Sequence, residues 1–408
     1  MPASEDEVIA LVRGAAGRRI RVVGAGHSWS RIAAPEQIGV SLDQLAGVIS
    51  IDRDRGEVTV RAGTRLRDLG ARLAAEGLAL PIVGSIAAQA IGGLIATGTH
   101  GSSLVHGNIA SLVVRMRLVS GRGELVDIAG SDPRLDGTRV HLGALGVVTE
   151  VTLPVVPAFQ LAETVETLPI AETPAALATI ATSAEYVKVW WLPHTPSALV
   201  FRYERTDEPT STRPNPTRQR WIDDHVMHGL VFPVVLQLGR IRGLIPPISR
   251  AVARSLAGPR RVGPSTLMLS TPLPARHRET EAAIPLAHAG EALDRMIRAI
   301  ARDDLRVNFP IEVRFVRGDT GWMSPAYGGD TCQLGVYCHG KDTDRLFASF
   351  WREMRAIGAR PHWGKELDHS AEEVRALWPL APRFLALRDE LDPDRVFASA
   401  FAARTLGP

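Results

Sequence analysis

The sequence predicts an α+β protein with two domains, and three observations support this prediction. Its 408 residues exceed the ~250–300 residues that one hydrophobic core usually supports. Short helical periodicities alternate with β-hairpin patterns in the first third of the chain. An apolar β-rich segment then ends near Pro154 and Pro157. We therefore expect one domain over residues 1–154 and a second over residues 155–408.

The first domain begins with local helix and hairpin signals. Ser4 with Glu7 has the spacing of a capping box before an apolar-periodic helix. Segments 47–66 and 112–128 each place a charged, glycine-containing turn between two β-prone runs, which is typical of a hairpin. Leucines at helical spacing over residues 64–77, ended by a glycine, predict a helix between them.

Composition excludes several classes of protein. Hydrophobic residues make up 45% of the chain and charged residues 22%, as in ordinary soluble globular proteins. A net charge of +3, from 47 basic and 44 acidic residues, is too balanced for a dedicated nucleic-acid binder. The most apolar window, residues 229–239, is about half a membrane span. We expect neither a nucleic-acid partner nor an integral membrane segment.

The two cysteines, Cys332 and Cys338, lie in one predicted strand. Their Cα atoms would be about 20 Å apart along an extended chain, whereas a disulfide needs about 5.5–6 Å. Free thiols suit a reducing compartment, and the acidic start of the chain is not a secretory signal. We expect a cytoplasmic protein.

Two loops rich in glycine and hydroxyl residues indicate a ligand. "GAGHSWS" (24–30) follows the apolar run Ile20–Val23 but has Trp29 where a dinucleotide-binding fingerprint needs its third glycine. "TGTHGSS" (97–103) has the same character. Such loops can wrap a pyrophosphate with backbone N–H groups and hydroxyl oxygens. Two of them in one domain predict a large phosphate-bearing ligand, the alternative being flexible turns without one.

Charged residues in the second domain suggest a second half of the site. In segment 308–316, apolar residues alternate with Glu312 and Arg314, so both charges face one side of a strand, about 6.6 Å apart along it. Alone, this pattern indicates an exposed strand face with a modest ion pair. Further on, "HWGK" places His362 and Lys365 three residues apart. His362 and His369 have neither HExxH spacing nor a third ligand, so we expect no metal site.

Six segments together resemble a known family. They are "VVGAGHSWS", "VGSIAAQAIGGLIATGTHGSS", "LGALGVVTEVTLPVVPAF", "VWWLPHT", "EVRF" and "RPHWGK". In this order they resemble the FAD-linked sugar-1,4-lactone oxidases (L-gulono- or D-arabinono-1,4-lactone type) and polyol oxidases of the vanillyl-alcohol-oxidase superfamily. The resemblance implies a two-subdomain FAD-binding domain followed by an α+β substrate (cap) domain with an antiparallel sheet, whose C-terminal segment returns toward the flavin. Family members usually carry a further strand ahead of "PASEDEV", so we expect one edge of the FAD domain to be absent.

The same resemblance implies FAD bonded covalently to His27 through the flavin 8α-methyl group. Gly84 replaces a bulkier residue that screens the flavin from dioxygen in related dehydrogenases, which favours an oxidase. The implied FAD contacts are Val22, Val23, Gly24, Ala25, Gly26, His27 and Ser28, then Thr97, Gly98, Thr99, His100, Gly101 and Ser102, with Ser85, Ala90, Gly93 and His362 near the flavin ring and Val148 at the adenine end.

The resemblance also implies the reaction. Glu312, Arg314 and Lys365 would contact the substrate hydroxyls above the flavin. A secondary alcohol of a sugar lactone would pass hydride to flavin N5, and dioxygen would reoxidise the flavin to give hydrogen peroxide. The cations would stabilise negative charge on the reduced flavin, and Glu312 would accept the proton if it is ionised. An alditol (xylitol- or sorbitol-type) oxidase, chosen by pocket residues such as Tyr337, remains an alternative. So do a dehydrogenase and a non-catalytic flavoprotein or carbohydrate-binding protein.

Overall fold

The computed structural model describes residues 1–211, 237–238, 241–270 and 277–407. Its α-helices are α1 (Glu5–Arg13), α2 (Leu66–Ala75), α3 (Ile91–Thr97), α4 (Leu135–Thr138), α5 (Thr173–Ala181), α8 (Ile245–Leu256), α9 (Ser265–Met268), α10 (Ala289–Arg302), α11 (Thr343–Arg355), α12 (Ala371–Leu377), α13 (Ala381–Leu391) and α14 (Ala400–Leu406). Its strands are β1 (Ile20–Val23), β2 (Ile38–Ser41), β3 (Val48–Asp52), β4 (Glu57–Arg61), β5 (Leu78–Ala79), β6 (Arg115–Val119), β7 (Leu125–Ala129), β8 (Val147–Pro154), β9 (Val156–Pro157), β10 (Gln160–Pro169), β11 (Tyr186–Trp191), β12 (Ser197–Thr206), β13 (Arg261–Pro264), β14 (Arg278–Pro285), β15 (Ile311–Val316), β16 (Thr331–Cys338) and β17 (Arg360–Pro361).

The N-terminal lobe is built on a five-stranded antiparallel sheet in the order β3-β4-β8-β6-β7. The two predicted hairpins are β3–β4 and β6–β7 of this sheet. Ser4 caps α1 by accepting a hydrogen bond from Glu7 N at 3.2 Å, whereas the Glu7 carboxylate accepts from Ala3 N. Apolar residues of α1, α2 and α3 share one core with β4, β6 and β8.

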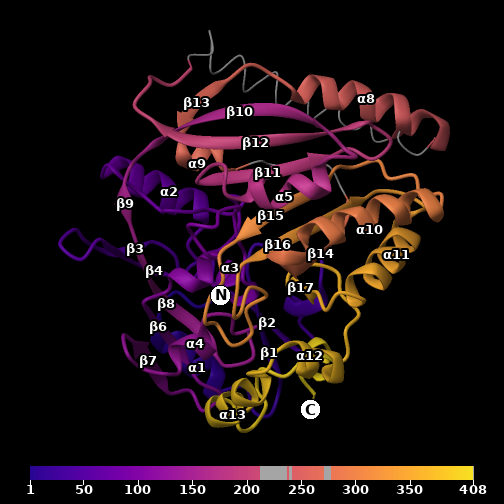
Figure 1. The fold of residues 1–408 in the computed structure, drawn as a ribbon. Coiled ribbons are helices and arrows are strands. Elements are labelled where there is room, and N and C mark those ends of the chain that lie inside the picture. The colour runs from indigo at the N-terminus through magenta and orange to yellow at the C-terminus, as the bar shows by residue number, and fades with distance from the viewer. Residues whose placement is uncertain (212–236, 239–240, 271–276, 408) are drawn as a thin grey trace.

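The second lobe is an eight-stranded antiparallel sheet in the order β13-β10-β12-β11-β15-β16-β14-β17. Helices α5, α10 and α11 cover one face of this sheet and form a separate core with it (Figure 1). Cross-strand partners point to the same face. The opposite face therefore carries Glu279 and Glu281 of β14 with Glu312 and Arg314 of β15. This arrangement agrees with the predicted antiparallel cap sheet.

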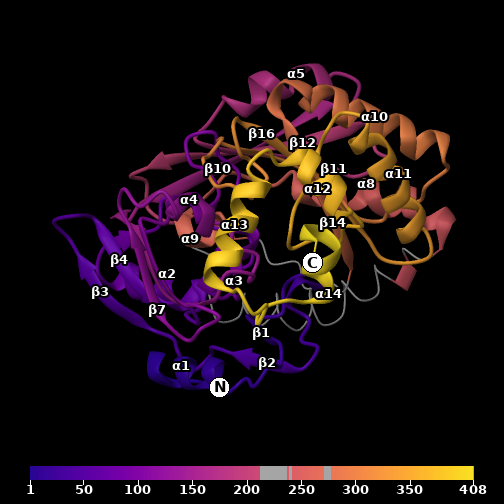
Figure 2. The same cartoon turned by 90° about the horizontal axis from the view of Figure 1, so that it is seen from below.

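The C-terminal segment returns to the N-terminal lobe. Figures 1 and 2 both show α13 close to α4 of the N-terminal lobe. Ile20 N at the start of β1 donates to Val396 O at 2.7 Å, and Phe384, Phe397 and Phe401 belong to the N-terminal core. The loop between β17 and α12, which carries Lys365, is thereby held between the two lobes.

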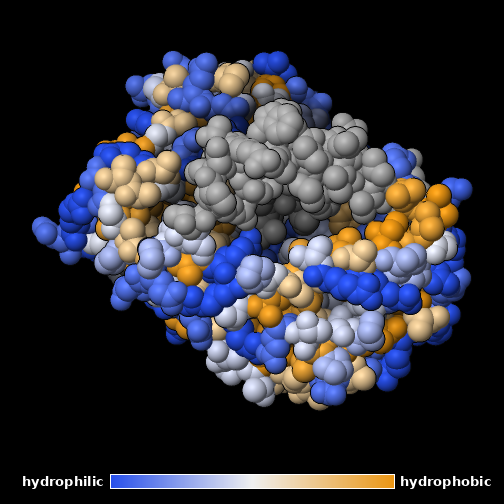
Figure 3. All heavy atoms as spheres, turned by 90° about the horizontal axis from the view of Figure 1, so that it is seen from above, coloured by the Kyte–Doolittle hydropathy of each residue, from blue (hydrophilic) through white to orange (hydrophobic). Residues whose placement is uncertain are grey.

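The sequence predicts no integral membrane segment and no disulfide. No helix in the described part of the chain is both long and apolar enough to cross a membrane; residues 229–239 lie outside this part except for 237 and 238. Hydrophobic and hydrophilic residues are interspersed on the face seen in Figure 3. Cys332 and Cys338 are buried free thiols on β16, which confirms that they form no disulfide.

Candidate active site

A cavity of about 620 Å³ lies between the two lobes. Both lobes and the C-terminal loop contribute to its wall, and it brings His27 together with Glu312, Arg314 and Lys365. Its lining residues are His27, Ser28, Trp29, Ser85, Ile86, Ala88, Gln89, Thr97, Thr99, His100, Trp190, His277, Glu279, Glu281, Glu312, Arg314, Tyr337, His362, Gly364 and Lys365.

His27 lies in the loop that follows β1. Gly26 has a φ of +73°, a conformation that glycine adopts without strain. The loop is fixed to the C-terminal segment because Trp29 N donates to Gly364 O at 2.8 Å and Ser30 Oγ donates to Trp363 O at 2.7 Å. Burial, with Arg65 and Lys365 nearby, lowers the pKa of His27. Its imidazole is therefore neutral at pH 7.

Two smaller cavities extend the large one into the N-terminal lobe. The first, about 100 Å³, shares His27 and Thr97 with the large cavity. The second, about 60 Å³, shares Gly24 and Gly93 with the first and ends at Val148. A Cβ added to Gly93 would meet no atom within 4 Å, so it would project into open space. This elongated, glycine-lined path fits an extended dinucleotide such as FAD.

Arg21 and His141 also line this path, and sequence reasoning missed both. Arg21 donates to Gly143 O at 2.7 Å and to Ser399 Oγ at 2.8 Å, but its Nε has no partner among the described residues. His141 accepts from Gly143 N, and its Nε2 likewise has none. Burial lowers the pKa of Arg21 only to about 10, so it stays charged at neutral pH. Buried donors without partners suit a phosphate-bearing ligand. The sequence feature that could have identified Arg21 is its place inside the apolar run of β1.

Glu312 is held by three donors. Its carboxylate accepts hydrogen bonds from Trp190 Nε1 at 2.7 Å, Tyr337 Oη at 2.6 Å and Arg314 Nη2 at 2.6 Å. Burial alone would raise the pKa of Glu312, but Arg314 and Lys188 more than offset it and lower the pKa to about 2. Glu312 and Arg314 share one strand face, as expected. The prediction that this face is exposed to solvent is wrong, because Glu312 is only 3% exposed.

Arg314 connects the lobes. Its Nη2 also donates to Ser85 Oγ at 2.9 Å, so the cap strand β15 reaches the segment that follows Gly84. Burial lowers the pKa of the guanidinium, but Glu312 outweighs burial and the net pKa is raised. Arg314 is therefore a fixed cation in the cavity wall.

Lys365 lies between the N-terminal loop and the cap sheet. Its Nζ is 2.5 Å from Glu279 Oε2 and 4.0 Å from Glu281 Oε2, both on β14. It is also 4.8 Å from the centroid of the Trp29 ring. The ammonium group is thus held at the cavity wall by the carboxylates of β14.

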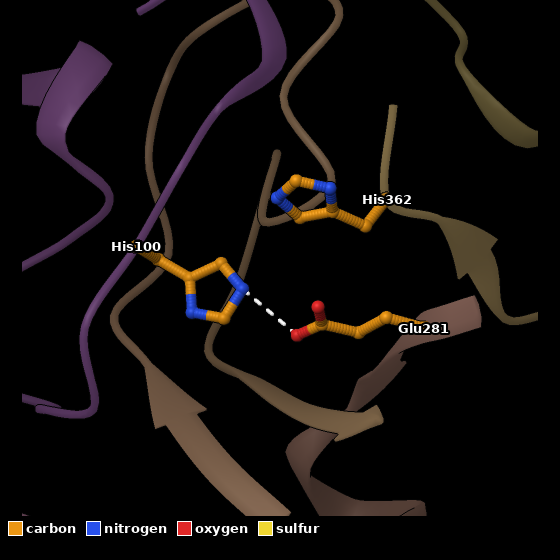
Figure 4. A group of neighbouring side chains, drawn as sticks. All are labelled: His100, Glu281 and His362. Atoms are coloured by element: carbon orange, nitrogen blue, oxygen red, sulfur yellow. Dashed lines mark ion pairs between the residues drawn. The ribbon is translucent and has the colours of Figure 1, made fainter. Parts of the chain in front are cut away.

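His100, Glu281 and His362 converge on one point of the wall (Figure 4). No motif or spacing in the sequence groups these three residues. His100 Nε2 is 3.0 Å from Glu281 Oε1, and its Nδ1 is 2.8 Å from Gly101 O, which can only accept. Both nitrogens of the His100 ring therefore face acceptor oxygens.

The same cluster has donor atoms near enough to hold a metal ion. However, His362 Nδ1 accepts from Gly364 N at 3.0 Å, so the proton of the neutral ring is on Nε2. Burial lowers the pKa of His362 to about 3, which keeps the ring neutral. A metal would need the Nε2 lone pair, so we assign no metal here. His369 lies elsewhere, against Trp351.

Four expected FAD contacts line none of the three cavities described above. Gly98 ends α3 with a φ of +69°. Gly101 is packed so closely that an added Cβ would lie 2.8 Å from Val83 O. Ser102 Oγ accepts from Phe315 N at 3.0 Å and donates to Val187 O. Gly84 lies beneath Thr99, whose Cγ2 would be 2.9 Å from an added Cβ.

Several lining residues escaped sequence reasoning. They are Trp29, Trp190, His277, Glu279 and Glu281. Glu279 and Glu281 are spaced by two, as residues on one strand face are, and this spacing is the signal that could have found them.

Comparisons with known proteins agree with this site. A model of the D-arabinono-1,4-lactone oxidase family matches residues 151–405, and an FAD-binding domain model matches residues 1–129. The chain is 34% identical to L-gulono-1,4-lactone dehydrogenase of Mycobacterium tuberculosis, over 100% of this chain and 95% of that protein. It is 30% identical to L-gulonolactone oxidase of Bos taurus, over 97% and 91%, and 33% identical to alditol oxidase of a Streptomyces species, over 92% and 88%. Cholesterol oxidase from B. sterolicum shares the fold, with a TM-score of 0.82 at 17% identity over 100% and 93% of the two chains.

The fold and the site together define an FAD-dependent oxidoreductase with a substrate-facing antiparallel sheet. Because the family model covers more than half of it, the chain belongs to the D-arabinono-1,4-lactone oxidase family. This confirms the resemblance seen in the sequence, the α+β fold class and FAD as the cofactor. The reaction class is the flavin-dependent oxidation of a sugar lactone.

Proposed function

We propose that this chain oxidises a secondary alcohol of a sugar-1,4-lactone in the cavity between its lobes, with dioxygen as the electron acceptor. The observation that carries the proposal is the meeting of His27 with Glu312, Arg314 and Lys365 in one cavity. FAD, when bound, accepts a hydride equivalent from the carbinol carbon. The chain's own residues then have to hold the substrate and fix the charges around it.

We assign Glu312 to orienting the substrate. A carboxylate offers about four acceptor positions, and three are taken by Trp190, Tyr337 and Arg314. One position is left for a substrate hydroxyl. A carboxylate with a pKa of about 2 is a weak base at neutral pH, so orienting the hydroxyl is a better role for it than proton removal.

Arg314 and Lys365 both supply positive charge at the cavity wall. Both are fixed by carboxylates, Arg314 by Glu312 and Lys365 by Glu279. Fixed cations stabilise developing negative charge without having to reorganise during the reaction. We assign them to the stabilisation of charge on the substrate oxygen and the reduced cofactor.

We further propose that His27 forms a covalent bond to the flavin. A neutral imidazole in an open glycine turn at the cavity wall is suited to this bond. The test is acid precipitation of the purified protein: yellow colour should stay in the pellet. His27→Ala should release it, and His288→Ala, which changes an exposed histidine, should not. Colour lost from the wild-type pellet would contradict the covalent bond.

We propose an oxidase rather than a dehydrogenase because Gly84 has no side chain that could screen the flavin. Relatives of both kinds exist, since the M. tuberculosis protein is named a dehydrogenase and the bovine protein an oxidase.

We also propose a cytoplasmic location, from the two buried free thiols, and a domain division at 154/155, between β8 and β10.

The decisive experiment is anaerobic bleaching of the flavin absorbance with a panel of aldono-1,4-lactones and alditols, followed by air. Bleaching by a lactone and prompt recovery in air support the proposal. Bleaching by alditols alone would make the chain an alditol oxidase. Slow recovery would make it a dehydrogenase. Bound FAD that no compound bleaches would identify a non-catalytic flavoprotein.

A further inference from the structure

One row of residues crosses the cavity face of the cap sheet. Glu312 on β15 pairs with Gly335 on β16, and Gly335 pairs with Glu281 on β14. Cross-strand partners lie on the same face. The middle strand therefore has no side chain in the row that carries the two carboxylates.

The Tyr337 ring covers this gap. Tyr337 is two residues beyond Gly335 and so lies on the same face of β16. A Cβ added to Gly335 would be 3.6 Å from both Cε2 and Oη of Tyr337. The ring therefore leans back along its strand, and this places its hydroxyl 2.6 Å from Glu312 Oε2. A Cβ at this position would be in ordinary van der Waals contact with the ring, so the Tyr337 ring lies directly over Gly335.

Tyr337 separates the two charged pairs of the cavity. Its cross-strand partner is Glu279, which holds Lys365, and its hydroxyl contacts Glu312, which holds Arg314. Burial, together with Glu279 and Glu312, raises the pKa of the phenol well above its ordinary value. The hydroxyl therefore stays protonated and donates to Glu312.

We propose that Tyr337 is a specificity-determining and positioning residue. Its ring limits how long a substrate can be and still reach Glu312, which favours a compact five-membered lactone over an extended open-chain polyol. Its hydroxyl fixes the orientation of the Glu312 carboxylate. This inference rests on the proposed function, since it names the feature of the same site that selects between the two substrate classes.

The test compares kcat/KM for an aldono-1,4-lactone and for the alditol of equal chain length. Tyr337→Ala removes the ring and opens the space that it fills. We expect the ratio of kcat/KM for the lactone to kcat/KM for the alditol to fall by at least about 10-fold. Tyr327→Ala removes a tyrosine outside the cavity lining and should leave the ratio unchanged. An unchanged ratio in Tyr337→Ala that retains its FAD would overturn the specificity role.

Tyr337→Phe tests the hydroxyl separately. It keeps the ring, so the ratio should stay as in the wild type, while kcat for the lactone falls about 10- to 100-fold from the loss of a hydrogen bond to a charged group. An unchanged kcat would overturn the positioning role.

Two further outcomes are distinguishable from these. If Tyr337→Ala does not retain FAD, Tyr337→Leu takes its place with the same criterion, because it fills part of the volume. If the wild-type protein oxidises neither compound, the proposed function fails, whatever the variants do.

Discussion

At the level of single side chains, Glu312 combines deep burial with three hydrogen-bond donors. Its pKa is about 2 in the folded protein, against about 4.3 for an unperturbed glutamate. The ionised form therefore stabilises the fold above about pH 4.3, and this contribution is lost as the pH falls toward 2.

Replacing Glu312 with Gln leaves Arg314 without its carboxylate. We expect kcat/KM for the lactone to fall by at least about 100-fold. The difference in unfolding free energy between wild type and variant should shrink as the pH is lowered from about 4.3 to 2. Denaturant titrations at several pH values measure this. A difference that grows over that range would contradict the assigned ionisation.

Gly84 is the second residue with a direct test. In Gly84→Ala, the new methyl group would lie 2.9 Å from Thr99 Cγ2, and Thr99 lines the cavity. We expect reoxidation of the reduced flavin by dioxygen to slow by at least about 10-fold, with little change in reduction by the lactone. Stopped-flow absorbance separates the two steps. Gly70→Ala on α2 is the matched control, and equal reoxidation rates in the two variants would count against the oxidase assignment.

Among structural elements, the loop after α3 joins the lobes. Ser103 N donates to Phe315 O at 2.6 Å, and Arg317 N donates to Ser103 O at 3.2 Å, so the loop pairs with the end of β15. Ser102 Oγ adds bonds to both β11 and β15. A loop expected to contact FAD thus also fixes the position of the cap sheet.

Ser102→Ala should weaken this junction. It leaves Phe315 N without the Ser102 hydroxyl as an acceptor, and we expect a loss of about 1–3 kcal/mol in unfolding free energy. Thermal or denaturant unfolding measures the change. Ser255→Ala, which removes an exposed hydroxyl bonded within its own helix, should be near neutral. Equal stabilities of the two variants would contradict the role of Ser102.

The helices and hairpins could be predicted from the sequence because the residues that determine each one are close together in the chain. Turn residues and alternation predicted β3–β4 and β6–β7, and the Ser4 cap and the leucine spacing predicted α1 and α2. The glycine loops predicted a phosphate-bearing ligand without identifying it. Only the family resemblance supplied the joint role of Glu312 and Lys365, since nothing in the sequence places them side by side.

The rest of the site is determined by the pairing of strands that are far apart in the sequence. The pairing of β16 with both β14 and β15 places Glu281 and Tyr337 beside Glu312. His100 meets Glu281 only because the two lobes pack together. Neither contact has a signal in a short window of sequence. The roles of individual site residues therefore stay predictions until variants are measured.

For the whole molecule, the binding path runs through the N-terminal lobe and opens between the lobes. A ligand that fills it contacts both lobes only in the folded state, so it should stabilise the protein. The His27→Ala variant allows FAD to be removed and added back. Its Tm should rise with FAD concentration, corresponding to about 2.7 kcal/mol at 100 times Kd. A Tm independent of FAD would contradict this linkage.

The central claim is that one cavity holds the flavin at His27 and presents the substrate to Glu312, Arg314 and Lys365. The most direct measurement is a crystal structure of the FAD-loaded protein with an aldono-1,4-lactone bound. We expect the flavin ring to extend from His27 beneath the cap sheet, with a lactone hydroxyl within hydrogen-bond distance of Glu312. A flavin outside this cavity, or a lactone bound away from β15, would contradict the account.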